Sequence, residues 1–275
     1  MKINIVTSLN GAGLERDAEI ISEILCDHEI LISTHGKPIT HSADIHIFLE
    51  VVSNRVIGLK GKKILIPNPE WFRPEWKKYL HHFDAIFCKT KHAMDIFIPL
   101  HHNVIYSGFT SIDMMDESIE RFESSMIHFP GKSKTKGTEL LQRDFKYDVN
   151  IFSHPDRSVI IHKMNQYPIH LCPSVAEGWG HYIWEAFSVG AFVITTDAAP
   201  MNEQEFIGIK LPCKRSRPHG LVPTFKTSSE EIRKAIQSVT PELIASARWV
   251  NRALFLKNDG EFRKTFSGLI ANYLQ

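Results

Sequence analysis

The chain has 275 residues, of which 43% are hydrophobic and 23% are charged; this is ordinary for a globular protein of one large domain or two modest ones. Its 32 Lys and Arg residues nearly balance its 31 Asp and Glu residues, so no global charge indicates a nucleic-acid or membrane partner.

The first half alternates short apolar runs with helical patterns, which is typical of a parallel sheet covered on both faces. After the first run, a turn at "NGAG" leads to Leu14, Ala18, Ile21 and Leu25 at helical spacing, which predicts an amphipathic helix. Further helices are expected around 74–82 and 91–98. Strands are expected at 2–8, 29–34, 44–50, 62–68, 84–90 and 103–108.

The second half begins a new α/β unit. "SMIHFPG", "KYDVNIFSH", "YPIHLCPS" and "AFVITTD" predict strands, and helices are expected at "TELLQRDF", near 156–165 and near 181–189. After about residue 225 the chain has a helical pattern throughout, in three successive segments: "SSEEIRKAIQSV", "PELIASARWVNRALFL" and "GEFRKTFSGLIANYL".

These patterns predict an α/β protein of two doubly wound domains with a helical tail. The acidic stretch "IDMMDESIERF" is the best linker between the two. We expect an N-terminal domain at 1–115, a C-terminal domain at 122–258, and a last helix at 260–275 that crosses back onto the first domain. Ligands settle beyond the carboxyl ends of parallel strands, so the expected site is a cleft between two such domains.

Four cysteines are widely spaced and form no C-x-x-C pair: Cys26, Cys88, Cys172 and Cys213. Buried free thiols in a reducing compartment are the expected state. The N-terminal apolar strand is too short for a signal peptide or a membrane span. The sequence therefore predicts a cytoplasmic, intracellular protein without an integral membrane segment; its small size would suit a compact viral enzyme.

The segment "CPSVAEGWGHYIWEAFSVGAFVITTDAAPMNE" (172–203) is the most informative one. Gly178 and Gly180 stand where the chain must turn sharply and let a ligand approach the backbone. A helix beginning near His181 would point its free N–H groups and positive dipole end at that turn, a favourable place for a phosphate.

Two carboxylates flank this turn. We expect Glu177 in the loop and Glu185 in the first turn of the helix. A carboxylate can accept two hydroxyl hydrogen bonds, as holding a ribose or a hexose requires, so the pair suits a sugar nucleotide. On spacing alone, an equal alternative is that Glu185 merely complements the helix dipole and Glu177 is a surface residue.

The segment closely resembles the E-x7-E region of retaining, nucleotide-sugar-dependent glycosyltransferases with two facing Rossmann-like domains, the GT-B fold. The matching positions are Pro173-Ser174, Glu177-Gly178-Trp179-Gly180, Glu185-Ala186, Gly190, Val193-Ile194 and Glu203. In that family the first glutamate contacts the donor sugar and the second the ribose, which implies these roles for Glu177 and Glu185. The loop before the final glutamate presents backbone groups to the sugar, here Ala198 to Asn202. The donor-binding residues implied by the resemblance are Gly13, Gly178, Trp179, Gly180, His181, Tyr182, Glu185, Ala199, Met201 and Asn202.

The basic loop "PGKSKTKGTELL" resembles the family segment whose two basic side chains hold the diphosphate. Lys136 matches the lysine of its K-G step, and Lys132 stands where the family usually has arginine. Lysine can neutralise a phosphate as a point charge but cannot make arginine's planar bidentate contact. The resemblance thus implies Glu177, Lys136 and Lys132 as catalytic residues; taken alone, the loop would be read as a solvated surface.

Two N-terminal segments resemble other parts of the family. Gly11-x-Gly13 resembles its glycine loop, although an ordinary strand–helix turn is an equal interpretation. "IPNPEWF" falls where members place polar residues facing the cleft, so Asn68 and Glu70 are candidate acceptor or donor contacts.

The sequence departs from the family in two places. Only one strand–helix unit fits between the helix after Gly137 and "PIHLCPS", where the family usually has two. The base-recognition loop is therefore uncertain, with Ser153 and His154 as candidates. His181-Tyr182 also replaces the usual leucine-proline, which puts the sugar preference in doubt.

The resemblance implies a retaining hexosyltransferase of the EC 2.4 type that uses a UDP- or GDP-sugar, without a further cofactor. The leaving phosphate oxygen could take the acceptor's proton, so no dedicated base is required. With no D-x-D motif and no histidine pair at ligand spacing, we expect no essential metal.

The expected partners are the nucleotide-sugar donor and a hydroxyl acceptor: a soluble glycan, a protein or a modified, hydroxymethylated DNA base. A monomer or a homodimer would be compatible with the sequence. The alternatives are a phosphorylase, a sugar-nucleotide epimerase, and a catalytically silent sugar-nucleotide-binding module.

Overall fold

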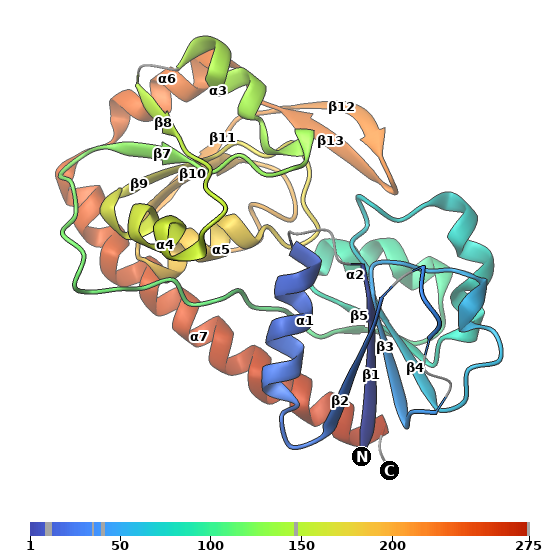
Figure 1. The fold of residues 1–275 in the computed structure, drawn as a ribbon. Coiled ribbons are helices and arrows are strands. Elements are labelled where there is room, and N and C mark those ends of the chain that lie inside the picture. Colours follow the sequence, from blue (N-terminus) through green and yellow to red (C-terminus); the bar gives the residue numbers. More distant parts are fainter. Residues whose placement is uncertain (9–12, 35, 40–41, 146–147, 274–275) are drawn as a thin grey trace. The chain divides into compact units, whose positions relative to one another are not determined.

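The computed structural model describes the whole chain except residues 9–12, 35, 40–41, 146–147 and 274–275. The chain forms two compact units (Figure 1). Unit 1 comprises Met1–Ser111, Pro218–Val222 and Asp259–Gln275, and unit 2 comprises Ile112–Arg217 and Pro223–Asn258.

Unit 1 contains a six-stranded sheet in the order β2-β1-β3-β4-β5-β6. All of its strand pairs are parallel. The interior strands are apolar and almost fully buried, as expected for a sheet covered on both faces. The strands are β1 (Lys2–Thr7), β2 (Glu29–Thr34), β3 (Ile45–Leu49), β4 (Lys62–Ile66), β5 (Ala85–Cys88) and β6 (Val104–Tyr106). All six strands expected here from the sequence are confirmed.

The helices of unit 1 lie largely where the periodicity predicts them. α1 (Gly13–Ile24) buries the apolar stripe that defined it in the sequence. α2 (Lys91–Phe97) is capped by Thr90, whose side chain accepts a hydrogen bond from the Ala93 N–H. The helix expected at 74–82 is present as the 3-10 helix η2 (Pro74–His82). Two shorter 3-10 helices are η1 (Asn54–Val56) and η3 (Ile98–Leu100).

Unit 2 contains a five-stranded parallel sheet in the order β11-β10-β9-β7-β8. Its strands are β7 (Met126–His128), β8 (Val149–Ile151), β9 (Ile169–Cys172), β10 (Phe192–Thr196) and β11 (Gly208–Leu211). Its helices are η4 (Lys134–Lys136), α3 (Thr138–Asp144), α4 (Arg157–Gln166), α5 (His181–Ser188) and α6 (Ser229–Ser238). A single strand–helix unit, β8–α4, lies between α3 and β9, as the sequence indicated.

The sequence did not predict β11 or the two-stranded sheet of β12 (Lys214–His219) and β13 (Val222–Lys226). The turn of this sheet, 218–222, packs within unit 1: the Leu221 N–H donates to the Pro69 carbonyl over 2.9 Å. Gly220 has a left-handed φ of +59°, and a Cβ there would lie 2.3 Å from the Glu70 carbonyl oxygen. Only glycine fits so close an approach.

The C-terminal segment corrects a sequence prediction. The two helices expected after residue 240 are one helix of 33 residues, α7 (Pro241–Tyr273). Its buried positions recur at helical spacing on both sides of Gly260, at Ala247, Asn251, Phe255, Phe262, Phe266 and Ile270. This continuous stripe outweighs the helix-breaking character of "NDG". No helix in the described part of the chain has the length and apolar composition that a membrane span requires.

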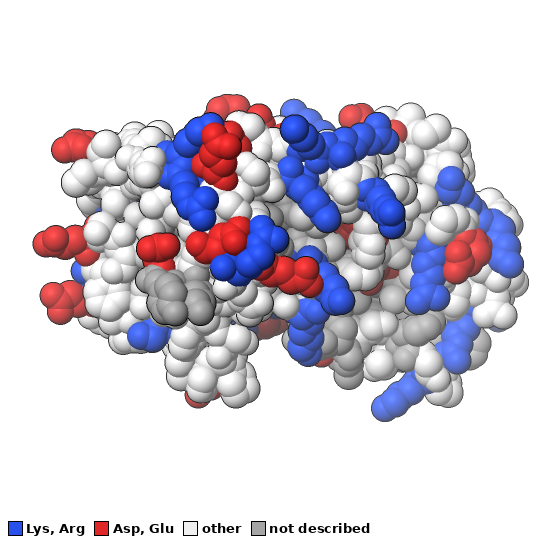
Figure 2. All heavy atoms as spheres, turned by 90° about the horizontal axis from the view of Figure 1, so that it is seen from above, with Lys and Arg blue, Asp and Glu red and all other residues white. Residues whose placement is uncertain are grey.

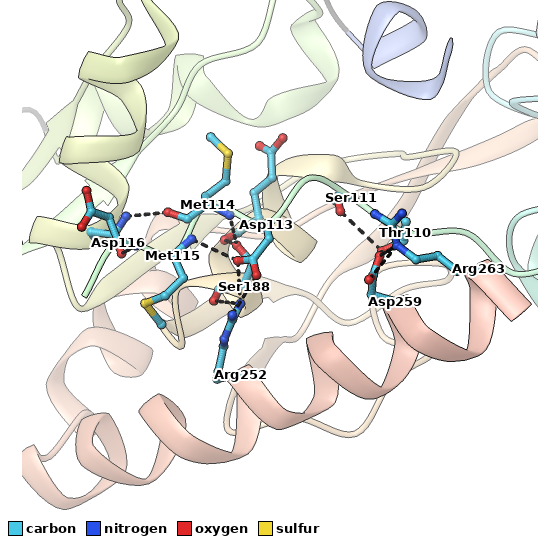
Figure 3. A network of polar contacts seen from close by, with 12 residues as sticks. Thr110, Ser111, Asp113, Met114, Met115, Asp116, Ser188, Arg252, Asp259 and Arg263 are labelled. Atoms are coloured by element: carbon cyan, nitrogen blue, oxygen red, sulfur yellow. Dashed lines mark hydrogen bonds and ion pairs between the residues drawn. The ribbon is translucent and has the colours of Figure 1, made fainter. Parts of the chain in front are cut away.

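The segment that follows β6 is fixed within each unit by contacts with α7 (Figure 3). In unit 2, Arg252 makes a bidentate ion pair with Asp113 over 2.6 and 2.7 Å and also donates to the Ser188 carbonyl. In unit 1, Asp259 accepts hydrogen bonds from Thr110 and Arg263. The confirmed architecture is therefore an α/β protein with two parallel sheets and a helical C-terminal tail.

Candidate functional site

The carboxyl ends of four adjacent strands of unit 2 gather the residues that the sequence singled out. β10, β9, β7 and β8 are neighbours in the sheet. The loops after them carry, in the same order, Ala198 to Asn202, the E-G-W-G turn, the basic loop and Ser153-His154. Ligands of open α/β sheets bind at this edge.

Glu177 is the centre of a hydrogen-bonded network in this unit. Its carboxylate is buried, with 7% of the residue exposed. Its Oε1 atom accepts hydrogen bonds from Lys136 Nζ and from Ser174 Oγ, each over 2.5 Å. Two donors on one carboxylate oxygen hold the side chain in one orientation.

The network extends to a tyrosine on α5. Ser174 Oγ lies 2.5 Å from the Tyr182 hydroxyl. Because Ser174 donates its one proton to Glu177, the hydrogen between the two hydroxyls comes from Tyr182. Burial, the main cause, raises the pKa of Tyr182 well above its usual range, so the phenol keeps this proton.

Lys136 reaches Glu177 because of the local backbone of the basic loop. η4 ends at Gly137, which has a left-handed φ of +73°; a Cβ there would lie 2.3 Å from the Pro173 carbonyl oxygen. The Lys136 stem packs on Gly131, whose ideal Cβ position is 3.0 Å from Lys136 Cγ. The ammonium lies over the Tyr182 ring, 4.4 Å from its centroid, a cation–π contact.

The helix after the glycine turn begins as expected. Gly180, with φ +84°, is the N-cap of α5, and no side chain caps the helix there. Trp179 stacks on Trp184 with ring centroids 4.7 Å apart. The positive dipole end of a helix favours anions, so this end of α5 is a candidate anion site, although its Ile183 N–H already donates to the Gly180 carbonyl over 2.9 Å.

Glu185 is placed differently from the prediction. It lies beyond the first turn of α5, which contains no acidic residue, and it is 3% exposed. The helix starts at His181, so the fifth residue is already one turn inside. Glu185 is therefore not a first-turn partner of the helix dipole, an effect that falls off beyond the first turn.

The loop after β10 is compact and locally hydrogen-bonded. The Asn202 side chain donates to Asp197 over 2.8 Å, and its N–H donates to the Ala198 carbonyl. Ala198 and Met201 are buried, while Asn202 is half-buried. This loop is a suitable support for backbone groups that face a ligand.

His128 lies at the end of β7, directly before the basic loop. The sequence did not single it out. Burial is the main cause that lowers its pKa to about 4, so the ring is neutral near pH 7. Nδ1 then donates to the Leu171 carbonyl, and Nε2 accepts from the Thr138 hydroxyl, both over 2.8 Å. The histidine thereby ties β9 to the start of α3.

The other predicted residues are scattered. Lys132, Ser153 and His154 are exposed in the loops after β7 and β8. Gly13 begins α1 of unit 1, and Asn68 and Glu70 follow β4 of unit 1; Gly11 lies outside the described residues.

Nothing in the described part of the chain brings three His, Cys, Asp or Glu side chains close enough to share a metal ion, and metal independence stays a prediction.

Sequence reasoning matched Ser174 to the motif but gave it no role in the site. Its spacing from Glu177, three residues on, is the only local signal of their contact. The contacts of Lys136 with Glu177 and of Ser174 with Tyr182 depend on the turn geometry, which residue types alone do not reveal.

No family model and no curated protein sequence matches this chain. Solved structures do. Alr3699/HepE of Anabaena, solved in complex with UDP, has 13% identity and a TM-score of 0.67, covering 99% of this chain and 100% of that one. Sucrose-phosphate synthase of Thermosynechococcus elongatus has 10% identity and a TM-score of 0.69 over 99% and 100% of the two chains. A UDP-N-acetylglucosamine 2-epimerase has 13% identity and a TM-score of 0.60 over 99% and 96%. The protein therefore has the GT-B fold, the fold of nucleotide-sugar glycosyltransferases; at these identities the likeness concerns the fold alone.

Proposed function

We propose that the protein is a glycosyltransferase that moves a sugar from a nucleotide-sugar donor to a hydroxyl acceptor, with retention and without a metal. The observation that carries the proposal is the network of Glu177, Lys136, Ser174 and Tyr182 at the carboxyl edge of the unit 2 sheet. A similar fold that binds UDP supports a nucleotide ligand.

The donor would be held by three kinds of group. The diphosphate would take the uncapped N-terminus of α5 together with Lys136 and Lys132. Glu177 would accept hydrogen bonds from sugar hydroxyls, and Glu185 would do so from the ribose. Ala199, Met201 and Asn202 would present backbone groups to the sugar.

Donor binding would then change the partner of Lys136. The Lys136 ammonium is paired with Glu177 over 2.5 Å. An arriving diphosphate would attract the same ammonium, and sugar hydroxyls would replace it on the carboxylate. The pair thus holds both side chains in position for the donor.

In the transfer step, the bond from the sugar's anomeric carbon to the phosphate oxygen breaks, and its electron pair stays on the diphosphate. A lone pair of the acceptor hydroxyl forms the new bond on the same face of the sugar. The acceptor's proton passes to the leaving phosphate oxygen. Lys136, Lys132 and the α5 N-terminus would stabilise the growing negative charge.

The first test is a thermal-shift panel of UDP-, GDP-, ADP-, TDP- and CDP-sugars on the full chain, followed by product analysis of any donor that binds. A ligand at one hundred times its dissociation constant adds about 2.7 kcal/mol of stability. We expect one donor class to shift the wild type and not Glu185→Ala. Glu205→Ala is the matched control, because that side chain is 96% exposed in the same unit.

The outcomes separate the alternatives. Transfer that is lost in Glu177→Ala supports the proposal, and a strict requirement for inorganic phosphate would indicate a phosphorylase. Conversion of the donor's sugar without an acceptor would indicate an epimerase. Binding without any turnover would indicate a silent module, and no shift with any donor would contradict the proposal.

A further inference from the structure

The strands β12 and β13 lie in a segment of concentrated positive charge that the proposed function does not use. Residues 206–229 contain no Asp or Glu and five Lys or Arg residues: Lys210, Lys214, Arg215, Arg217 and Lys226. The chain as a whole has a net charge of only +1. The near balance of the whole chain therefore conceals a local excess of positive charge, which attracts anions.

Most of these cations are exposed and have no ion-pair partner. The exposed ones are Lys214, Arg215 and Arg217 of β12 and Lys226 of β13. None of these four side chains forms an ion pair within the described part of the chain. Lys210 differs, because it is paired with Glu205 over 3.1 Å. Four positive charges are thus presented to solvent on a single pair of strands.

A second basic segment lies beside these strands. The basic loop after β7 supplies three lysines, and residues 124–138 contain no Asp or Glu. Val175 joins the two segments: its N–H donates to the Thr135 carbonyl over 2.7 Å, and its carbonyl accepts from the Phe225 N–H over 2.8 Å. Segments joined through one intervening chain lie about 10 Å apart, so their charges act together. We call the exposed cations of both segments the basic surface, all of it in unit 2: Lys134, Lys214, Arg215, Arg217 and Lys226.

The composition of the basic surface favours one kind of anionic partner. Figure 2 looks down on β12 and β13 as drawn in Figure 1, and it shows Lys and Arg side chains gathered near the middle of the face, with few acidic side chains between them. Residues 130–141 and 208–226, all of which the structure describes, expose no large apolar side chain. Segments that lie on membranes insert such side chains into the lipid. A hydrophilic polyanion therefore fits this surface better than a membrane does.

The shape of the strand pair indicates which polyanion fits. β12 and β13 form a two-stranded sheet, and the major groove of a DNA duplex, about 12 Å wide, admits a two-stranded ribbon. Alternate residues of a strand share a face, so Arg215 and Arg217 lie on one face of β12, about 7 Å apart. The planar guanidinium of arginine matches phosphate oxygens two at a time. Both arginines can therefore contact the backbone of one duplex.

We propose that the basic surface binds a duplex nucleic acid through its phosphates. Val175 stands two residues before Glu177, so the bound duplex lies beside the candidate donor site of the same unit. The binding itself does not depend on sugar transfer. Together with the proposed transfer, it names a nucleic acid as the carrier of the hydroxyl acceptor, and this part alone rests on the proposed function.

The test is fluorescence anisotropy of the full chain with a short labelled DNA duplex at several salt concentrations. Four to five cations on phosphates predict that log K falls with log salt at a slope of about −4, so a fourfold rise in salt should weaken binding about 250-fold. The double variant Arg215→Gln, Arg217→Gln should lower this slope by about 2 and weaken binding at least about tenfold at low salt.

A matched double variant removes the same charge elsewhere in unit 2. Arg248→Gln, Lys257→Gln changes two exposed cations of α7. Arg248 lies against Gly190, just before β10, whereas the basic loop and Val175 follow the carboxyl ends of β7 and β9. This variant should bind the duplex as the wild type does. Equal weakening in both double variants, or no binding even at about 50 mM salt, would overturn the proposal.

Two further measurements on the same proteins separate the other interpretations. Vesicles that contain phosphatidylserine should bind more weakly than the duplex; tighter binding of the vesicles would indicate a membrane surface and overturn the proposal. The thermal shift with the nucleotide-sugar panel should be the same in the wild type and in Arg215→Gln, Arg217→Gln. Its loss in that variant would mean that the arginines serve the donor, against the proposal. A donor shift without duplex binding would overturn this inference and leave the proposed function standing, whereas duplex binding without any donor shift would support the basic surface and contradict the proposed function.

Discussion

At the scale of single residues, the pair of Lys136 and Glu177 joins stability to the proposed chemistry. The two side chains are 18% and 8% exposed, and truncating one partner of such a pair leaves the other charge poorly solvated. We expect Lys136→Met and Glu177→Gln each to lower the free energy of unfolding by about 1–3 kcal/mol. The double variant should be more stable than the sum of the two losses predicts, as measured by urea denaturation.

The same set of variants separates structure from function. Donor binding should be lost in Lys136→Met and should not return in the double variant, even though that variant is more stable than the sum of the two losses predicts. A double variant that regained donor binding would show that the lysine acts only by supporting the fold.

A buried histidine predicts a pH dependence. Burial, the main cause, lowers the pKa of His170 to about 4, and its Nε2–H donates to the carbonyls of Met164 and Tyr167. The unfolded chain takes up the proton first, near pH 6.5. The stability that the neutral ring contributes is therefore complete above pH 6.5 and is lost as the pH falls toward 4, by about 3 kcal/mol.

The comparison is His170→Phe, which has no titrating ring. It should be less stable at pH 7, because two carbonyls lose their donor, but its further loss between pH 7 and pH 4 should be smaller than that of the wild type. Urea denaturation at pH 7 and pH 4 measures the loss of stability in each protein. If the wild type and His170→Phe lose the same free energy of unfolding between these pH values, His170 is not a source of the acid sensitivity.

Residue identity singles out residues that are local in sequence better than residues that only the fold brings together. Glu177 and Lys136 stand in motifs that are local in sequence. The sequence placed Glu50 at the end of the strand 44–50. In the structure Glu50 has a left-handed φ of +63°, and nothing in "FLEVV" indicates this conformation. Asp17 and Lys89 are 72 positions apart, so their pairing is a property of the fold.

At the scale of elements, hydrophobic pattern predicted most of the parallel strands because they are buried on both faces and read as short apolar runs. It failed for β12, which is charged and mostly exposed. β12 has no buried residue that would impose an alternation, whereas its partner β13 buries Val222 and Thr224. The remaining sequence signal for a hairpin was Gly220, which lies in the turn between "KRSRPH" and "LVPTF".

The continuous helix α7 yields a prediction about glycine. Gly260 lies in its interior, and a Cβ there would meet no atom within 4 Å. Gly260→Ala should raise the free energy of unfolding by about 0.5–1 kcal/mol, because alanine has the higher helix propensity and restricts the unfolded chain. Gly190→Ala should do the opposite, since Gly190 has φ +62° and a Cβ there would lie 2.4 Å from the Arg248 carbonyl oxygen. Urea denaturation of both variants measures the two signs; a loss of stability in Gly260→Ala would contradict a continuous helix.

At the scale of the whole molecule, each unit has its own apolar core. One includes Val6, Phe48, Leu65 and Ile86, and the other includes Leu141, Leu171 and Ile194. Domains with separate cores can open separately. All the proposed donor residues except Gly13 belong to unit 2, so a donor ligand should stabilise the two cores unequally.

Native-state hydrogen exchange with the nucleotide sugar that emerges from the panel tests this expectation. At one hundred times the dissociation constant, the amides of β9 and β10 that exchange by opening of unit 2 should slow by about 100-fold, the equivalent of about 2.7 kcal/mol. The amides of β3 and β4 in unit 1 should slow much less. In Glu185→Ala the nucleotide sugar should not slow exchange in either unit. Equal slowing in the two sheets would mean that the chain opens as one cooperative body, with α7, whose residues belong to both units, as the element that couples the two cores.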